Sequence, residues 1–223
     1  MHDLRVTEAG LASPLPHVDF LGLPFRLLSE QQVVRLIIEY CGAPFRYVVT
    51  PNAYNVVAAH DEPSLLSIYR GAWLSLCGSQ ILRVLAALEG LALPVVIGTD
   101  LVMALLPALD DQNAESMPQH LLIVGPPTGA ERKLRTAYPN LTIDVLPTTE
   151  NLACNAKLQL AVARTCMDRH WEILLLCAGS PVNELIARHL AELGCSAGVA
   201  LCVGEAIDFL ADARVRARAE HNT

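Results

Sequence analysis

The stretch EILLLCAGSPVNELIARHL, residues 172–190, decides the fold class of this chain. Residues 173–178 are an apolar run without polar alternation, which is typical of a β-strand buried on both faces. A Gly-Ser-Pro turn follows, and Pro181 stands where the first turn of a helix tolerates proline. We therefore predict a strand over 172–179 and a helix over 181–193, the kind of unit from which parallel sheets are built.

The same order of elements extends over the rest of the sequence. Predicted strands cover 17–23, 45–50, 73–77, 93–98 (a short extended run), 120–125, 141–146 and 198–204. Predicted helices cover 29–42, segments up to about 69, 79–89, 99–109, 129–138, 151–169 and a last one to about 213. Strands that alternate with helices indicate an α/β fold with a mainly parallel sheet and helices on both faces.

Three parts are expected along the chain. Residues 1–16 lack periodicity and are expected to form a flexible arm, and residues 17–213 a single α/β domain. Residues 214–223 form a basic tail with three arginines. The polar stretch 110–119 either separates two lobes or links two halves of one domain.

No segment is predicted to span a membrane. The longest apolar stretch, 85–109, is interrupted by Glu89, Pro94 and Asp100, whereas a membrane span needs roughly 20 apolar residues. The N-terminus has no apolar signal-peptide region, so we expect a cytoplasmic protein. The leucine-rich segment 81–93 is expected to pack in the core rather than against a membrane or a partner.

The net charge and the mean hydropathy limit the classes of partner that this protein can bind. The net charge is −7, with 16 basic and 23 acidic residues, so there is no basic excess for a nucleic-acid partner. The mean hydropathy of +0.36 is high for a soluble protein. A sheet buried on both faces explains it, and so does an apolar surface that docks onto a partner or membrane. We expect a homo-oligomer formed through exposed apolar helices.

Ligands of open α/β sheets bind beyond the carboxyl ends of the strands. Four such ends carry polar residues or glycines, at 50–52, 125–129, 179–184 and 204–208. Each has a structural alternative: a helix cap at 50–52, a tight turn at 125–129, and a well-capped helix at 179–184. Asp208 stands in an apolar helix start and needs a partner, either Arg214 or a ligand hydroxyl.

Other chemistries lack their motifs. Thr99 or Asp100 either caps the helix over 99–109 or faces a ligand. The seven histidines are isolated from cysteines and acids at ligand spacing, so no metal site and no metal cofactor are expected. The glycine pattern at 125–129 is neither a dinucleotide fingerprint nor a P-loop. That absence counts against a third reading, a Rossmann-like oxidoreductase or methyltransferase.

Five segments, in this order, resemble the WecG/TagA/CpsF family of bacterial glycosyltransferases. They are VVTPNAYNVV (48–57), VVIGTDLVMALL (95–106), LLIVGPPTGAERKLRTAYPNL (121–141), LLLCAGSPVNELIARHL (174–190) and ALCVGEAIDFLADARVRAR (200–218). The family's enzymes move a sugar, often N-acetylmannosamine, from a UDP donor to a polyprenyl-diphosphate-linked acceptor in cell-surface polysaccharide synthesis. The resemblance implies a Rossmann-like fold and an inverting hexosyltransferase at the cytoplasmic membrane face, with peripheral membrane contact.

The resemblance also implies site residues. Thr50 and Asn52 would face the reacting sugar and the acceptor, and Asn183 stands where the family has a glutamine. The residues expected to line the UDP-sugar site are Asp100, Gly125, Gly179, Ser180, Pro181, Glu184, Gly204 and Asp208. The UDP-sugar is a substrate, and no cofactor is implied.

Two departures from the family pattern bear on catalysis. The family's Asp-Gly pair, whose aspartate is thought to be the general base, aligns with Gly78 and Ser79. The family's basic, aromatic C-terminal appendage, used for membrane docking, has no counterpart in residues 1–223. Either Glu205 or Asp208 replaces the base, or the chain is a catalytically degenerate relative that binds a nucleotide sugar or a partner transferase as a scaffold.

Overall fold

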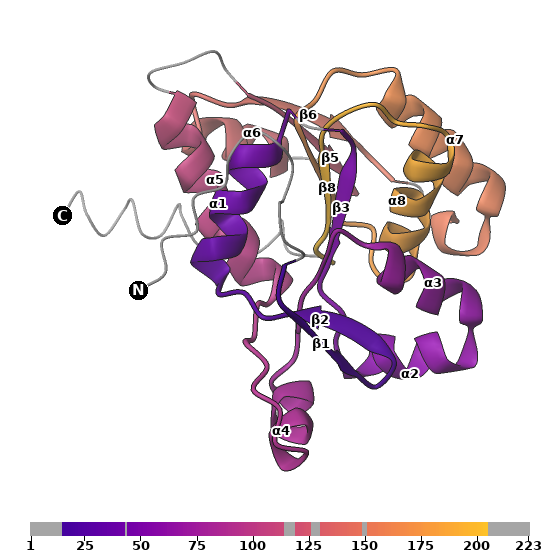
Figure 1. Ribbon diagram of the computed structural model, residues 1–223. Coiled ribbons are helices and arrows are strands. Elements are labelled where there is room, and N and C mark those ends of the chain that lie inside the picture. The colour runs from indigo at the N-terminus through magenta and orange to yellow at the C-terminus, as the bar shows by residue number, and fades with distance from the viewer. Residues whose placement is uncertain (1–14, 43, 114–118, 126–129, 149–150, 205–223) are drawn as a thin grey trace.

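The computed structural model describes residues 15–42, 44–113, 119–125, 130–148 and 151–204. Six parallel strands form its central sheet, in the order β4-β3-β8-β7-β5-β6 (Figure 1). Their bounds are β3 Arg46–Val49, β4 Leu74–Ser75, β5 His120–Val124, β6 Thr142–Leu146, β7 Ile173–Leu176 and β8 Val199–Cys202. The predicted α/β fold with a parallel, Rossmann-like sheet is confirmed.

Helices cover both faces of this sheet, as predicted. One face packs against α1 (Glu30–Tyr40), α5 (Gly98–Asn113) and α6 (Ala130–Ala137). The other packs against α2 (Ala53–Asp61), α3 (Pro63–Gly71), α7 (Ala156–Met167) and α8 (Val182–Glu192), as Figure 1 shows on the right of the sheet. All four residues of β7 are buried, and they alternate between the two cores, so the apolar run is a strand covered on both faces.

Local signals fix several helix ends. Ser29 caps α1, and its hydroxyl and the Gln32 side chain form a capping box. Val33, Leu36 and Ile37 then form the buried stripe that packs toward α5. Helix α7 begins later than predicted, because residues 152–154 form a short 3-10 turn and Asn155 caps the α-helix proper.

The predicted strand over 17–23 is confirmed only over 17–20, because a turn interrupts it. The chain instead forms an antiparallel hairpin of β1 (His17–Phe20) and β2 (Leu23–Arg26). Leu21 and Gly22 make the two-residue turn with φ of 49° and 76°, the positive angles that such hairpins require. Because Leu21 is apolar, the sequence pattern does not indicate a turn at this position.

The polar stretch expected to begin at residue 110 is helical at its start. Helix α5 runs to Asn113 and carries Pro107 in its interior. Asp110 is buried, and its carboxylate accepts a 2.9 Å hydrogen bond from the Asn140 backbone N–H. Residues 110–113 therefore belong to the domain, whereas 114–118, residues 1–14 of the arm expected over 1–16, and the tail over 214–223 lie outside the described residues.

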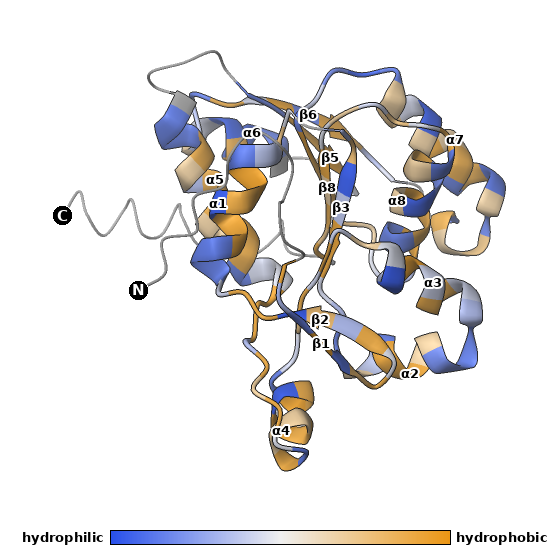
Figure 2. Cartoon of the chain, viewed as in Figure 1, coloured by the Kyte–Doolittle hydropathy of each residue, from blue (hydrophilic) through white to orange (hydrophobic). Residues whose placement is uncertain are grey.

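The expectation that segment 81–93 packs in the core is wrong for most of its helix. Helix α4 (Gln80–Leu88) projects from the body in Figure 1 and buries only Leu82 and Ala86. Its other large apolar side chains are exposed: Ile81 by 63%, Val84 by 52%, Leu85 by 43% and Leu88 by 80%. Figure 2 shows α4 as a largely hydrophobic element at the periphery.

Candidate functional site

The carboxyl ends of the parallel strands share one edge of the sheet. There the turns after β3, β8, β7 and β5 bring together Thr50, Gly204, Gly179 and Gly125. The glycines at 204, 179 and 125 all have positive φ. This edge is where ligands bind in open α/β sheets, so we take it as the candidate site.

Two of its glycines are places of close backbone approach. A Cβ on Gly125 would lie 2.7 Å from the Cys177 carbonyl carbon, so the turns after β5 and β7 are in contact. A Cβ on Gly98 would lie 3.1 Å from both the Thr50 hydroxyl and the Val203 Cα. Helix α5 therefore begins at the site, and the start of a helix suits an anion.

The predicted residues of the 95–106 segment lie at this helix start. Thr99 and Asp100 are inside the first turn of α5, which begins at Gly98, so neither caps it from outside. Both are half-buried.

The residues after β3 have structural partners of their own. The Thr50 hydroxyl donates to the Cys202 carbonyl at 3.3 Å and so joins β3 to β8. Asn52 is exposed and caps α2, with its Oδ1 accepting from the Asn55 backbone N–H at 3.1 Å. The helix-cap alternative for 50–52 is thus present at Asn52, beside the site.

A hydrogen bond to a buried side chain stabilises the turn between β7 and α8. Asn183 is buried, and its Oδ1 accepts from the Ala178 backbone N–H at 2.8 Å. Pro181 stands at the N-cap of α8, and Gly179 is half-buried with open space around its Cα. Asn183 therefore shapes the turn instead of facing solvent.

A polar cluster joins this turn to the buried residues beneath it. Its members are Asn55, Tyr69, Ser180 and Glu184, from α2, α3 and the β7–α8 unit. The Asn55 Nδ2 donates to the Ser180 hydroxyl at 2.7 Å, and Ser180 is 3.1 Å from Glu184 Oε1. The Tyr69 hydroxyl donates to the same Oε1 at 3.3 Å.

The cluster encloses an acid. Glu184 is 5% exposed, and burial raises the pKa of its carboxyl, although hydrogen bonds from Ser180 and Tyr69 act against that rise. Burial, and then the nearby Glu184, also raise the pKa of the Tyr69 hydroxyl. Of the predicted residues, Ser180 and Glu184 are in direct contact. Sequence analysis missed Asn55 and Tyr69. The capping-box spacing from Asn52 to Asn55 was visible, but the contact across 125 residues was not.

The sequence comparison now decides the family. The model of the Glycosyl transferase WecG/TagA/CpsF family matches residues 18–219, nearly the whole chain. The chain belongs to this family. No curated protein matches it as a relative. Membership in the WecG/TagA/CpsF family supports a glycosyltransferase-type function in cell-surface polysaccharide synthesis.

Gly78, the position expected to align with the aspartate of the WecG/TagA/CpsF family, has no room for a side chain in this chain. A Cβ on Gly78 would lie well inside 3.0 Å of the Thr50 carbonyl oxygen, which is backbone and cannot swing aside. The Gly78 N–H also donates to the Pro51 carbonyl at 3.0 Å, so the two loops are bonded to each other. Glycine is therefore required at 78 as long as residues 50–51 stay where they are. The two acids expected to replace the base, Glu205 and Asp208, lie outside the described residues.

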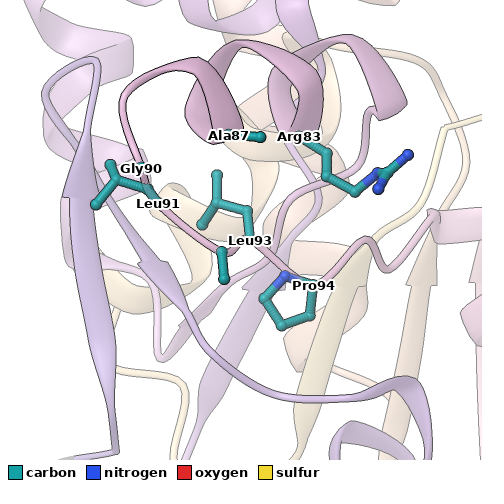
Figure 3. A pocket seen from close by; sticks show the side chains of 7 residues that line it. Arg83, Ala87, Gly90, Leu91, Leu93 and Pro94 are labelled. Atoms are coloured by element: carbon teal, nitrogen blue, oxygen red, sulfur yellow. The ribbon is translucent and has the colours of Figure 1, made fainter.

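A hollow of about 480 Å³ lies between α4 and the segment 90–94 (Figure 3). Its lining is chiefly apolar, with Arg83 as the charged member, and it contains none of the predicted site residues. The Arg83 Nε is already engaged, because it donates to Gln80 at 2.8 Å. A sugar diphosphate would find few polar partners there, so the strand ends remain the candidate site.

Among the described residues, no group of three or more His, Cys, Asp or Glu side chains could hold a metal ion. In the same residues, no helix is both long enough and apolar enough to cross a bilayer.

Proposed function

We propose that this chain transfers a sugar from a UDP-sugar donor to a polyprenyl-diphosphate-linked acceptor, with inversion, at the carboxyl edge of its sheet. One observation carries the proposal. In a chain matched to the family over 18–219, the turns expected to hold the donor share one edge of a parallel sheet, beside the start of α5.

The turn geometry suits a diphosphate. Gly179 and Gly204 have open space where a Cβ would stand, so a ligand can approach the backbone closely at both, whereas Gly125 lets the turns after β5 and β7 meet. The α5 N-terminus adds the N–H groups of its first turn and the positive end of its dipole. Thr50 and Asn52 follow β3 at the same edge, where the reacting sugar and the acceptor would meet.

The proton taken from the acceptor needs a base. A general base typically contributes about 10²- to 10⁴-fold in rate, and Gly78 cannot supply one. We propose that Glu205 or Asp208 does, since in the sequence Glu205 comes next after Gly204 and Asp208 follows in the same segment. Positioning and charge stabilisation would sustain slow transfer without either acid.

The second candidate function is a catalytically degenerate relative that binds a nucleotide sugar or a partner transferase as a scaffold. The observation that favours it is Gly78, where the Thr50 backbone excludes any side chain. The two candidates share the donor site and differ in turnover.

Calorimetric titration with UDP tests the donor site that both candidates need. We expect binding between micromolar and low-millimolar concentration, and no binding at several millimolar would reject the donor site. A transfer assay then compares the unmodified protein with Glu205→Gln and Asp208→Asn, with Asp168→Asn at an exposed helix end as the control. A rate loss in one of the first two identifies the base. Equal rates in all four proteins reject the replacement, and absence of turnover supports the scaffold.

The exposed face of α4 supports our proposal that the protein self-associates and makes peripheral contact with the inner face of the cell membrane. Four large apolar side chains project from one nine-residue helix, and apolar area that water covers favours burial. Light scattering at tens of micromolar tests the first expectation, and a monomer mass would count against it. Co-sedimentation with anionic vesicles tests the second.

A further inference from the structure

The hydrogen bonds around Ser180 have a direction. The Asn52 backbone N–H can only donate, and it donates to Asn55 Oδ1 at 2.9 Å. This bond fixes the orientation of the Asn55 amide, so its Nδ2 faces Ser180. The Nδ2 is again only a donor, and the Ser180 hydroxyl therefore accepts from it at 2.7 Å.

The proton of Ser180 is then directed inward. The hydroxyl lies 3.1 Å from Glu184 Oε1, an acceptor that also receives the Tyr69 hydroxyl. A serine hydroxyl has one proton and two lone pairs. Ser180 donates its proton to Glu184 and uses one lone pair to accept from Asn55. One lone pair of the Ser180 oxygen therefore remains.

That lone pair is available to a ligand. Ser180 is exposed at the carboxyl edge of β7, whereas Asn55, Tyr69 and Glu184 behind it are all at least nine-tenths buried. Glu184 Oε2 is buried and has no hydrogen-bond partner among the described residues, so the carboxyl is held through Oε1 alone.

We infer that Ser180 acts as a hydrogen-bond acceptor toward the donor substrate, binding an O–H or N–H group of its uridine or sugar and not its diphosphate. The diphosphate oxygens carry no proton at neutral pH and can only accept, so they cannot pair with a hydroxyl whose proton is engaged. Asn55, Glu184 and Tyr69 are positioning residues that set this polarity. The inference rests on the proposed function and assigns a specificity to one turn of that site.

The polarity separates Ser180 from the role expected of a Gly-Ser-Pro turn before a helix. Such a turn would ordinarily donate to phosphate through its hydroxyl and backbone. In this chain backbone N–H groups would bind the phosphates, and the Ser180 side chain would accept a hydrogen bond from a neutral O–H or N–H group.

Binding of three probes tests the inference: UDP, UDP-N-acetylmannosamine, and pyrophosphate competing against UDP. We expect Ser180→Ala to weaken UDP-N-acetylmannosamine by about 2- to 10-fold, the range of one neutral hydrogen bond, and to leave pyrophosphate unchanged. A matching loss for UDP places the bound group on uridine, and an unchanged UDP affinity places it on the sugar. Ser67→Ala, an exposed serine on α3, is the control.

Two results would overturn the inference: an equal loss for pyrophosphate, which would make Ser180 a phosphate donor, or no loss for any probe. Absence of UDP binding by the unmodified protein would instead reject the proposed function, and the Ser180 assignment with it.

Substitution of Glu184 tests the polarity itself. Glu184→Gln keeps an acceptor oxygen for Ser180, so the ratio of pyrophosphate to sugar-nucleotide affinity should stay within about 2-fold of the unmodified protein. Glu184→Met removes the acceptor and frees the Ser180 proton, so that ratio should rise in favour of pyrophosphate. A merely structural role would not move this ratio. If Glu184→Met fails to fold, the Ser180→Ala comparison still decides.

Discussion

Helices α1 and α4 have the same kind of N-cap, but their apolar faces lie in opposite environments. Each has a serine N-cap, Ser29 or Ser79, and each carries apolar side chains at helical spacing. Helix α1 turns its stripe inward, with Ile37 fully buried, whereas α4 turns Leu88 outward at 80% exposure. Periodicity thus predicts that a helix forms, while the presence of a packing partner decides whether its apolar face is buried.

The largest expected effect comes from the buried stripe of α1. Ile37→Ala should lower the free energy of unfolding by about 2 to 5 kcal/mol, because it leaves a cavity between α1 and α5. Urea titration followed by circular dichroism measures this loss. A loss below about 1 kcal/mol would mean that α1 is packed no better than α4.

A second substitution sharpens the comparison within α4 itself. Leu82 is 1% exposed on the side that faces the body, so Leu82→Ala should cost about 2 to 3 kcal/mol in the same titration. Leu85→Ala, on the exposed side of the same helix, is the matched control and should cost far less. Equal losses would show that both sides of α4 are packed in solution, as they would be in an oligomer.

The two caps should differ modestly. Ser29→Ala removes a capping box and should cost about 1 kcal/mol, whereas Ser79→Ala removes a single bond of 3.5 Å and should cost about 0.5 kcal/mol. Thermal unfolding of both variants measures the difference. A larger loss for Ser79→Ala would contradict this ranking of the caps.

The smallest effect on stability is expected at the tip of α4. Leu88→Gln should change the free energy of unfolding by less than about 0.5 kcal/mol, because the side chain lies in water. The same substitution should reduce self-association measured by light scattering. An unchanged particle mass in a protein that does associate would exclude Leu88 from the contact.

Much of the fold could be predicted, because strands such as β7 are buried on both faces and leave an unbroken apolar signal. The exceptions have physical causes. A hairpin turn at Leu21 reads as continuous strand, and the polar residues from Asp110 read as a linker, although α5 continues to Asn113. In the site, glycines and caps could be placed from their neighbours. The contacts of Ser180 with Asn55 and of Glu184 with Tyr69 join segments more than 100 residues apart, which local pattern cannot reveal.

Gly78 has a consequence for how this protein can change. Because the Thr50 carbonyl occupies the space that a Cβ would need, an aspartate at 78 requires a change in the neighbouring loop as well as the substitution itself. The loop at 50–51 must first move away from Gly78, and that move gives up the hydrogen bond from the Gly78 N–H to Pro51 before any carboxylate is gained. A side chain at position 78 is therefore accessible only together with a change at residues 50–51. If the chain transfers sugar as proposed, laboratory selection for faster transfer should yield acidic residues at other positions along the carboxyl edge of the sheet before it yields one at position 78.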